Sequence, residues 1–560
     1  MRTGPCELFV ELADIVKISK FNLTRISHLH KILSPTERKL FIIFMVVGAV
    51  GIFGILGNVY VGFTKIKPAP GGKFTEGIVG RPTNLNPLLV PQSDADQDLR
   101  ALIHAGLLAV NADGSFRPML AESLPQISED LKTYTVKLRS DLRWPNNKPI
   151  TAGDVIYTVK SIQDKDAGSY LRNSFRFVKA EQIDDLTVQF KLREPSVTFS
   201  ENLLTPIIPE NSSLDNNLRP VGAGPYQIKR YRFNSDRKIT AVELAANENF
   251  APHPPYIKRV TLKFFDTKEK LIDAYKNGEL DNLGTLESQG LKTIGAISYD
   301  LAISLPEYQA VFFNLEKNPI LKSLKVRQAL TLATNRQELI DGENTRSPIG
   351  GPILAEQETN PQEYSLEKAN QLLNEEGWLL KDGNVRKKND QPLSFILTTN
   401  DVGLNTNAAE KLKKQWESIG VQVVLRILPN KELIEKIIPP RDYETILLFE
   451  NMGHDPDPFP FWHSSQTEAP GLNLSVLKNS EIDKIIVDAR STPDPNIRNE
   501  LYGKFLNLLQ AQSPAIFLIQ PLYTYIASKE IKGIEINKLI IPSERFSNIQ
   551  DWYVKSKRTF

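Results

Sequence analysis

One apolar run near the N-terminus constrains this chain more than any other feature. Residues 40–64 read LFIIFMVVGAVGIFGILGNVYVGFT, without a single charged side chain. As a helix, such a run is about 37 Å long at ~1.5 Å per residue, which is enough to cross a hydrocarbon core of ~30 Å. It lies behind a leader of 39 residues, and no A-x-A-like cleavage site follows it. We therefore predict a transmembrane signal anchor over 40–64, after a cytoplasmic segment over 1–39.

Cysteine usage and flanking charges narrow how the chain meets the membrane. The only cysteine, Cys6, lies far upstream of the apolar run, whereas a lipoprotein anchor needs a cysteine just after it. A single cysteine also excludes an intramolecular disulfide and any CxxC metal or redox motif. Basic residues flank the run on both sides, so their distribution does not orient it. The alternative, a buried helix of the soluble body, would need an all-round apolar helix isolated at one chain end.

The rest of the chain has the composition of a globular protein with several cores. Of its residues, 41% are apolar and 24% are charged, which is a globular composition. A chain of 560 residues is too long for one hydrophobic core. The 68 lysines and arginines nearly balance 66 aspartates and glutamates, so we expect no nucleic-acid partner. A short linker that contains PAPGG is predicted over 65–73.

Strand-like and helix-like segments alternate after this linker. Residues 133–139 alternate at period two, as a half-buried strand does. Thr151, with Asp154 three residues later, is typical of a capped helix start. Residues 408–428 combine a helix, a stop at Gly420 and a β-branched strand. Such units predict an α/β fold in which helices cover sheets.

Sequence motifs of common enzymes are absent. The chain holds no Walker loop, G-x-S-x-G, H-E-x-x-H or dinucleotide-binding fingerprint. We therefore expect no cofactor and no catalysis. Any transport energy would have to come from partner subunits.

The stretch NMGHDPDPFPFWHSSQ, residues 451–466, gathers the most reactive side chains. His454, Asp455, Asp457 and His463 are residue types that bind zinc or nickel. The interleaved prolines keep the backbone extended, so neighbouring side chains diverge, and we predict no metal site. An acid/base pair of Asp455 and Asp457 stays open, because their spacing alone does not exclude it. The third interpretation is the rim of a ligand pocket.

Six ordered blocks carry a resemblance to a known family. They lie between residues 81 and 378 and read RPTNLNPLL, YTVKLRSDLRWPNNKPITAGDV, GAGPYQI, NGELDNL, VRQALTLATNRQELI and KANQLLNEEGW. In this order they resemble the family 5 extracellular solute-binding proteins, the peptide- and dipeptide-binding class that feeds ABC importers. Two positions depart from the family pattern. Asn86 replaces the aspartate of an Asp-Pro pair, and Asn146-Asn147 replaces an Asp-Gly turn with similar turn chemistry.

The resemblance implies a two-lobe, periplasmic-binding-protein-like (type II) fold with an extra inserted domain. The lobes would close about a hinge, and the ligand would supply the contacts that favour the closed state. By this analogy the first lobe is discontinuous. The expected division is lobe I over 74–108, 222–305 and 505–560, the inserted domain over 109–221, and lobe II over 306–504.

The resemblance also implies which residues meet the ligand. By position, Asp455 would meet the α-ammonium of a peptide, because a charge-assisted hydrogen bond is strong once closed lobes exclude water. Backbone groups of Met452 and Gly453 would pair with the peptide main chain. His454 and Trp462 complete the expected ligand-binding set. The alternatives are a turn or capping role for Asp455 and core packing for Trp462. Asp457, which precedes Pro458, is interpreted as a structural residue that forms an Asx turn.

These expectations combine into one function with two alternatives. The leading hypothesis is a membrane-anchored receptor with its large C-terminal body on the extracytoplasmic side, which captures short peptides for an ABC permease and ATPase. The first alternative is a receptor of the same fold for a nickel chelate, an oligosaccharide or a signalling peptide. The second is a membrane-tethered hydrolase or metalloenzyme that uses His454, Asp455 and His463.

Overall fold

A computed structural model describes most of the chain. It covers residues 33–91, 93–213, 218–285, 298–304, 306–340, 345–352, 362–380, 383–453 and 457–559. Two compact units divide the chain. The first is Met1–Lys67 with Ser556–Phe560, and the second is Pro68–Lys555.

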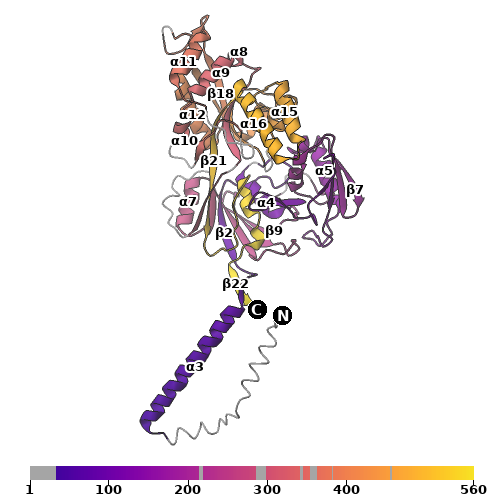
Figure 1. Cartoon of the computed structure of the whole chain (residues 1–560), viewed down its shortest axis with the longest axis vertical. Coiled ribbons are helices and arrows are strands. Elements are labelled where there is room, and N and C mark those ends of the chain that lie inside the picture. Colours follow the sequence, from indigo (N-terminus) through magenta and orange to yellow (C-terminus); the bar gives the residue numbers. More distant parts are fainter. Residues whose placement is uncertain are drawn as a thin grey trace. The chain divides into compact units, whose positions relative to one another are not determined.

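The first unit contains the predicted membrane helix. Helix α3 (Pro35–Phe63) has 29 residues and a mean hydropathy of 2.7, and it is long and apolar enough to cross a membrane. Strand β1 (Lys65–Ala69) follows it at once and pairs with β22 (Lys555–Thr559) in a two-stranded sheet. Figure 1 shows β22 at the end of α3. The predicted linker over 65–73 therefore contains a strand, and the last residues of the chain join this unit instead of lobe I.

The second unit is built on a mixed sheet of twelve strands, which confirms the predicted α/β class. Ten of them follow one another in hydrogen-bonding order, and β13 and β15 pair with β21. In sheet order the strands are β19 (Gln422–Leu428), β18 (Ser394–Asn400), β20 (Thr445–Asn451), β14 (Glu307–Phe313), β21 (Ala515–Ser528), β12 (Asn282–Thr285), β2 (Lys73–Val79), β11 (Arg259–Phe265), β10 (Ile239–Ala246) and β9 (Tyr226–Phe233), with β13 at Ser298–Ser304 and β15 at Thr345–Pro348.

Strand β21 joins the two halves of this sheet (Figure 1). Its first part, Ala515–Ile519, pairs with β14. Its second part, Leu522–Ser528, pairs with β13. We call the half that contains β14, β15 and β18–β20 lobe II, and the half that contains β2 and β9–β13 lobe I. The chain passes between the lobes within β21, at Gln520 and Pro521, and again between β13 and β14.

Helices cover both faces of the sheet in lobe II, so β14 is buried on both of its faces. Val311 and Phe313 pack with residues of α9 and α12, whereas Tyr308, Ala310 and Phe312 pack with α15 and α16. Successive side chains of a strand point to opposite faces, which produces this alternation. The helices of lobe II are α8 (Pro319–Lys322), α9 (Leu324–Leu332), α10 (Arg336–Ile340), α11 (Leu366–Glu375), α12 (Gly403–Glu417), α13 (Asn430–Glu432), α14 (Phe459–Trp462), α15 (Ser480–Arg490) and α16 (Pro495–Gln512), and those of lobe I are α4 (Asp94–Ile103) and α7 (Lys268–Lys276).

The predicted insertion has its own sheet and hydrophobic core. The start of its helix α5 (Ala152–Gln163) is fixed by Asp154, whose carboxylate accepts the Thr151 N–H at 2.9 Å and the Glu210 N–H at 2.8 Å. This confirms the predicted helix start. The remaining elements are β3 (Leu108–Val110), β4 (Phe116–Pro118), β5 (Gln126–Ile127), β6 (Thr133–Lys137), α6 (Arg172–Phe175), β7 (Lys179–Asp184), β8 (Thr187–Lys191) and the 3-10 helix η1 (Val197–Leu204).

The lobe boundaries along the chain stay predictions, and the contacts argue against one of them. The expected return to lobe I at residue 505 falls inside α16. Phe505 and Leu509 of this helix pack in the lobe II core with Tyr308, and β21 is still paired with β14 as far as Ile519. The hydrogen bonds of β21 therefore move the return to lobe I to about residue 520.

A buried ion network closes lobe I around the C-terminal part of the chain. Arg545 lies in the 3-10 helix η5 (Pro542–Phe546) and is 2% exposed. Its Nε donates to Glu76 Oε1 of β2 at 2.7 Å, and its Nη1 donates to Asp98 Oδ1 of α4 at 2.7 Å. Glu76 and Asp98 are 0% and 3% exposed. One guanidinium therefore holds three elements together away from water.

Replacing Arg545 by methionine should destabilise the protein by about 3–5 kcal/mol, because two carboxylates would be left buried without their cation. Urea-induced unfolding, followed by tryptophan fluorescence, measures the loss. Lys478→Met is the control, because Lys478 and its partner Glu316 are 59% and 58% exposed and solvent-exposed ion pairs contribute little to stability. Equal, small losses in both variants would contradict the role given to Arg545.

Candidate functional site

The stretch over 451–466 begins where β20 ends, at the junction between the lobes. Asn451, the last residue of β20, donates through Nδ2 to the carbonyl oxygen of Ile540 at 2.7 Å. Ile540 belongs to the C-terminal segment that packs with lobe I, whereas β20 belongs to lobe II. The stretch therefore starts at a hydrogen bond between the two lobes. His454 and Asp455 lie outside the described residues, so their predicted ligand contacts stay predictions.

Met452 and Gly453 have backbone N–H groups that are already hydrogen-bonded. The Met452 N–H donates to the Pro306 carbonyl at 3.1 Å, and the Gly453 N–H donates to Asn451 Oδ1 at 2.9 Å. Pairing with a peptide main chain would therefore use the carbonyl oxygens of these residues or displace these bonds. The prediction did not say which backbone groups of Met452 and Gly453 would pair with a peptide, and these bonds leave the carbonyl oxygens as the available groups.

Gly453 lies where the inserted domain meets lobe II. Its φ is +78°, and a Cβ added here would lie 2.3 Å from Glu201 Oε1 of η1. A second contact joins the same two parts, because Asn173 Nδ2 donates to Gln466 Oε1 at 3.0 Å. The left-handed backbone favours glycine at this position, whereas the flexible Glu201 carboxylate could move away from an added side chain.

Asp457 has a structural role, as the turn interpretation proposed. Its Oδ1 accepts the Phe459 N–H at 3.0 Å, which is the bond of an Asx turn. Its Oδ2 pairs with Arg490 Nε of α15 at 3.0 Å. Both oxygens are thus engaged inside lobe II, which removes the support for an acid/base pair of Asp457 with Asp455.

Trp462 and His463 pack inside lobe II. The Trp462 side chain is 1% exposed, and its ring centroid lies 6.0 Å from that of Phe312 and 6.0 Å from that of Phe517. This is the core-packing alternative for Trp462, and its direct contact with ligand stays a prediction. His463 stacks on Phe459 at 4.3 Å, and burial lowers its pKa. Within the described ranges, no group of three histidine, cysteine, aspartate or glutamate side chains could hold a metal ion.

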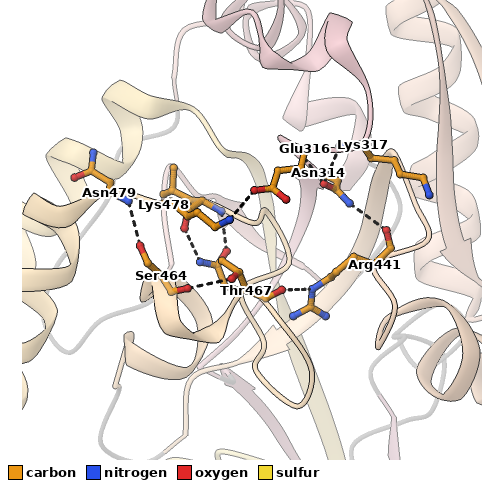
Figure 2. Close-up of polar contacts among 10 residues, drawn as sticks. Asn314, Glu316, Lys317, Arg441, Ser464, Thr467, Lys478 and Asn479 are labelled. Atoms are coloured by element: carbon orange, nitrogen blue, oxygen red, sulfur yellow. Dashed lines mark hydrogen bonds and ion pairs between the residues drawn. The ribbon is translucent and has the colours of Figure 1, made fainter.

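The loop after α14 is fixed to lobe II by Arg441. Arg441 lies in a turn and is 9% exposed. It donates through Nε to the Thr467 carbonyl at 3.1 Å and through Nη2 to the Gly471 carbonyl at 2.6 Å. Figure 2 shows the same region, where Asn314 bonds the Arg441 carbonyl and Ser464 accepts the Asn479 N–H. The far end of the 451–466 stretch is therefore held rigidly, whereas its near end faces lobe I.

Three acidic residues near the lobe junction, Asp94, Glu307 and Glu450, were missed from the sequence. Burial, and then the negative charge of Asp94, raises the pKa of Glu307 to about 7. Glu307 begins β14 of lobe II and pairs across the sheet with Asn451, whereas Asp94 begins α4 of lobe I. Next to Glu307, the Tyr308 hydroxyl donates to Glu450, and burial raises the pKa of Glu450 to about 8. Acidic residues such as Asp94 and Glu307 have no local sequence signal, because they are far apart in the sequence and interact only in the folded chain.

This geometry suits a cationic group better than an anion. The charge of Asp94 in lobe I acts on Glu307 in lobe II, which pairs with the end of β20, and a positive charge placed near them would favour their ionised forms. The two lobes are joined by two chain crossings, and polar side chains such as Asn451 lie at their junction.

The family follows from comparison with known proteins. A family model described as "Bacterial extracellular solute-binding proteins, family 5 Middle" matches residues 115–472, and the chain belongs to this family. Its members are binding proteins and not enzymes, so the hydrolase alternative is withdrawn. The chain is thus an extracytoplasmic solute-binding protein of the ABC importer class, as the ordered blocks predicted.

Two curated relatives and one solved structure show how far the likeness extends. The oligopeptide-binding protein AppA of Bacillus subtilis (strain 168) is 27% identical over 519 residues, covering 87% of this chain and 92% of AppA. The structure of AppA with a nonapeptide has a TM-score of 0.76 at 25% identity, over 87% of this chain and 100% of that one. The nickel-binding periplasmic protein of Escherichia coli (strain K12) is 26% identical over 465 residues, covering 77% of this chain and 86% of that protein.

Glu307→Gln should flatten the pH dependence of stability. The pKa of Glu307 is raised from 4.5 to about 7 in the folded state, so its protonated form stabilises the fold at low pH. That stability is lost as the pH rises from about 4.5 through 7. At pH 8 the variant should be more stable than the natural protein by at most about 3 kcal/mol, since one pKa unit corresponds to ~1.36 kcal/mol.

Urea unfolding at pH 5, 6, 7 and 8 measures this profile. Glu316→Gln, at a glutamate that is 58% exposed, is the matched control and should keep the natural profile. A Glu307→Gln profile that is identical to the natural one would show that the junction does not disfavour the charge of Glu307.

Proposed function

We propose that the protein captures short peptides for an ABC permease and its ATPase. The observation that carries the proposal is the likeness to AppA, which extends over 87% of this chain and over the whole of a structure solved with a nonapeptide. Such coverage includes both lobes and the inserted domain. The inserted domain contacts lobe II beside Gly453, so it lies close to the proposed ligand.

The charges at the lobe junction support a ligand with a free ammonium group. Asp455 is the proposed partner of this group, and Asp94 and Glu307 add negative charge from the two lobes. Charge-assisted hydrogen bonds of this type are about twice as strong as neutral ones, and closure of the lobes would strengthen them further by excluding water.

A nickel chelate is the second candidate ligand. The similarity to the Escherichia coli nickel-binding protein favours it, at 26% identity over 77% of this chain. Against it, the described residues contain no cluster that could hold a metal ion directly. A chelate held through its organic part would still be compatible with this arrangement.

We also propose that α3 stays attached as a membrane anchor. The helix is longer than a cleavable signal core usually is, and 0% of its most apolar window is buried within the protein. An attached receptor keeps its ligand close to the permease, which raises the effective concentration of loaded receptor there.

A pool of short peptides should raise the melting temperature of the detergent-solubilised full chain. Peptide at 100 times its Kd adds ~2.7 kcal/mol to the free energy of unfolding, because it binds only the folded state. Asp455→Asn should weaken binding by roughly 10- to 100-fold, since it removes a charged hydrogen-bond partner worth ~1.5–3 kcal/mol.

The matched control is Asp442→Asn, whose carboxylate pairs with Lys317 at 3.0 Å away from the junction. It should leave the peptide-induced shift unchanged. A shift that persists in Asp455→Asn would contradict the ammonium contact. A shift produced by nickel with free histidine, and by no peptide, would favour the second candidate.

A further inference from the structure

We propose that the β1–β22 sheet is a docking surface for anionic phospholipid headgroups. The proposal concerns four basic side chains of the first unit, Lys65 and Lys67 of β1 and Lys557 and Arg558 of β22, which we call the basic ribbon. It rests on the proposed retention of α3 in the membrane. No feature of the lobe junction enters the argument.

The ribbon begins where the apolar helix ends. Helix α3 stops at Phe63 and β1 starts at Lys65, with only Thr64 between them. A strand advances about 3.3 Å per residue, so Lys65 and Lys67 lie within roughly 13 Å of the end of the helix. An apolar helix that spans the bilayer places its end at the headgroups, and a lysine side chain adds several ångströms of reach. The ribbon is thus held beside the lipid phosphates by the helix itself.

The C-terminal strand is attached to the same helix end. The Nη1 atom of Arg558 donates to Thr64 Oγ1 at 3.2 Å and to the Val61 carbonyl at 3.4 Å. The last carbonyls of a helix carry partial negative charge, which an arginine stabilises. Chain segments almost 500 residues apart in sequence therefore bring their basic residues to one place, which local sequence alone does not predict.

The charge of this surface has one sign. All four basic residues are exposed. The sequence contains no acidic residue from Leu40 to Lys73 and none from Trp552 to Phe560. The acidic residue described in this unit, Glu37, lies near the opposite end of α3. Ile66, between the two lysines of β1, is 60% exposed and adds an apolar contact suited to the interface. Basic clusters next to a membrane helix attract anionic lipid, and each lysine or arginine near the surface adds to the attraction.

Boundary-lipid selectivity of the full chain tests the proposal. The chain is reconstituted into nanodiscs of phosphatidylcholine and phosphatidylglycerol, and electron spin resonance gives the relative association constant of spin-labelled phosphatidylglycerol over phosphatidylcholine. We expect a ratio of about 5 that falls toward 1 at high salt. In Lys65→Gln/Lys67→Gln/Lys557→Gln the ratio should be close to 1 already at low salt. Arg558 is kept so that its bonds to the helix end remain.

The matched control changes three exposed lysines of the second unit, as Lys148→Gln/Lys229→Gln/Lys387→Gln. It has the same net charge as the ribbon variant and should keep the natural ratio. A natural ratio near 1, or a ribbon variant that keeps the natural ratio, would overturn the proposal, and so would an equal loss in the control. Circular dichroism and the melting temperature check that both variants fold.

Reconstitution places α3 in the bilayer whatever happens to it in cells, so this test does not depend on processing. Retention is measured separately, from the mass of the chain that is extracted from membranes of a producing bacterium. A chain cut after residue 64 would contradict the anchor, whereas a lost lipid preference in the intact chain would contradict the ribbon alone.

Discussion

A buried guanidinium that joins distant parts of the chain determines how the C-terminal segment packs on lobe I. Arg545 bonds Glu76 and Asp98, which precede it by 469 and 447 residues. Burying three charges is expensive unless each is paired, so the fold of lobe I depends on the return of the C-terminal segment. The same return runs through β21, whose two parts belong to different lobes. A single chain thus builds two separately packed bodies that share two narrow crossings.

This construction explains how binding could be coupled to closure. Each lobe has its own buried clusters, so rotation about the crossings leaves the cores intact. One bond that bridges the lobes is polar and runs from the Asn451 side chain to the carbonyl of Ile540. The negative charge of Asp94 in lobe I raises the pKa of Glu307 in lobe II, so like charges from the two lobes interact here. Under the proposed function, a cationic ligand would relieve that repulsion, which is the kind of differential contact that a population shift requires.

The sequence predicted what local pattern encodes. The apolar run gave α3, alternation gave β6, and the Thr151–Asp154 spacing gave the start of α5, because each depends on residues within a few positions. The turn role of Asp457 was likewise local. The crossing in β21, the β1–β22 pair and the acidic neighbours Asp94 and Glu307 depend on residues hundreds of positions apart, and no periodicity reports such pairs. The contacts of α16 argue against the expected lobe boundary at residue 505 for the same reason, since the sequence of α16 does not indicate the lobe on which it packs. Asp455 stays a prediction from resemblance alone.

Calorimetric titration with two forms of one peptide pool tests whether Asp455, together with carboxylates at the lobe junction, holds the free ammonium group of a peptide. The detergent-solubilised full chain is titrated with a pool of short peptides and with the same pool after N-terminal acetylation, which removes the positive charge and keeps the side chains and backbone. We expect a saturable heat of binding with the free pool and little or none with the acetylated pool. Equal binding of both pools, or binding of neither, would contradict it.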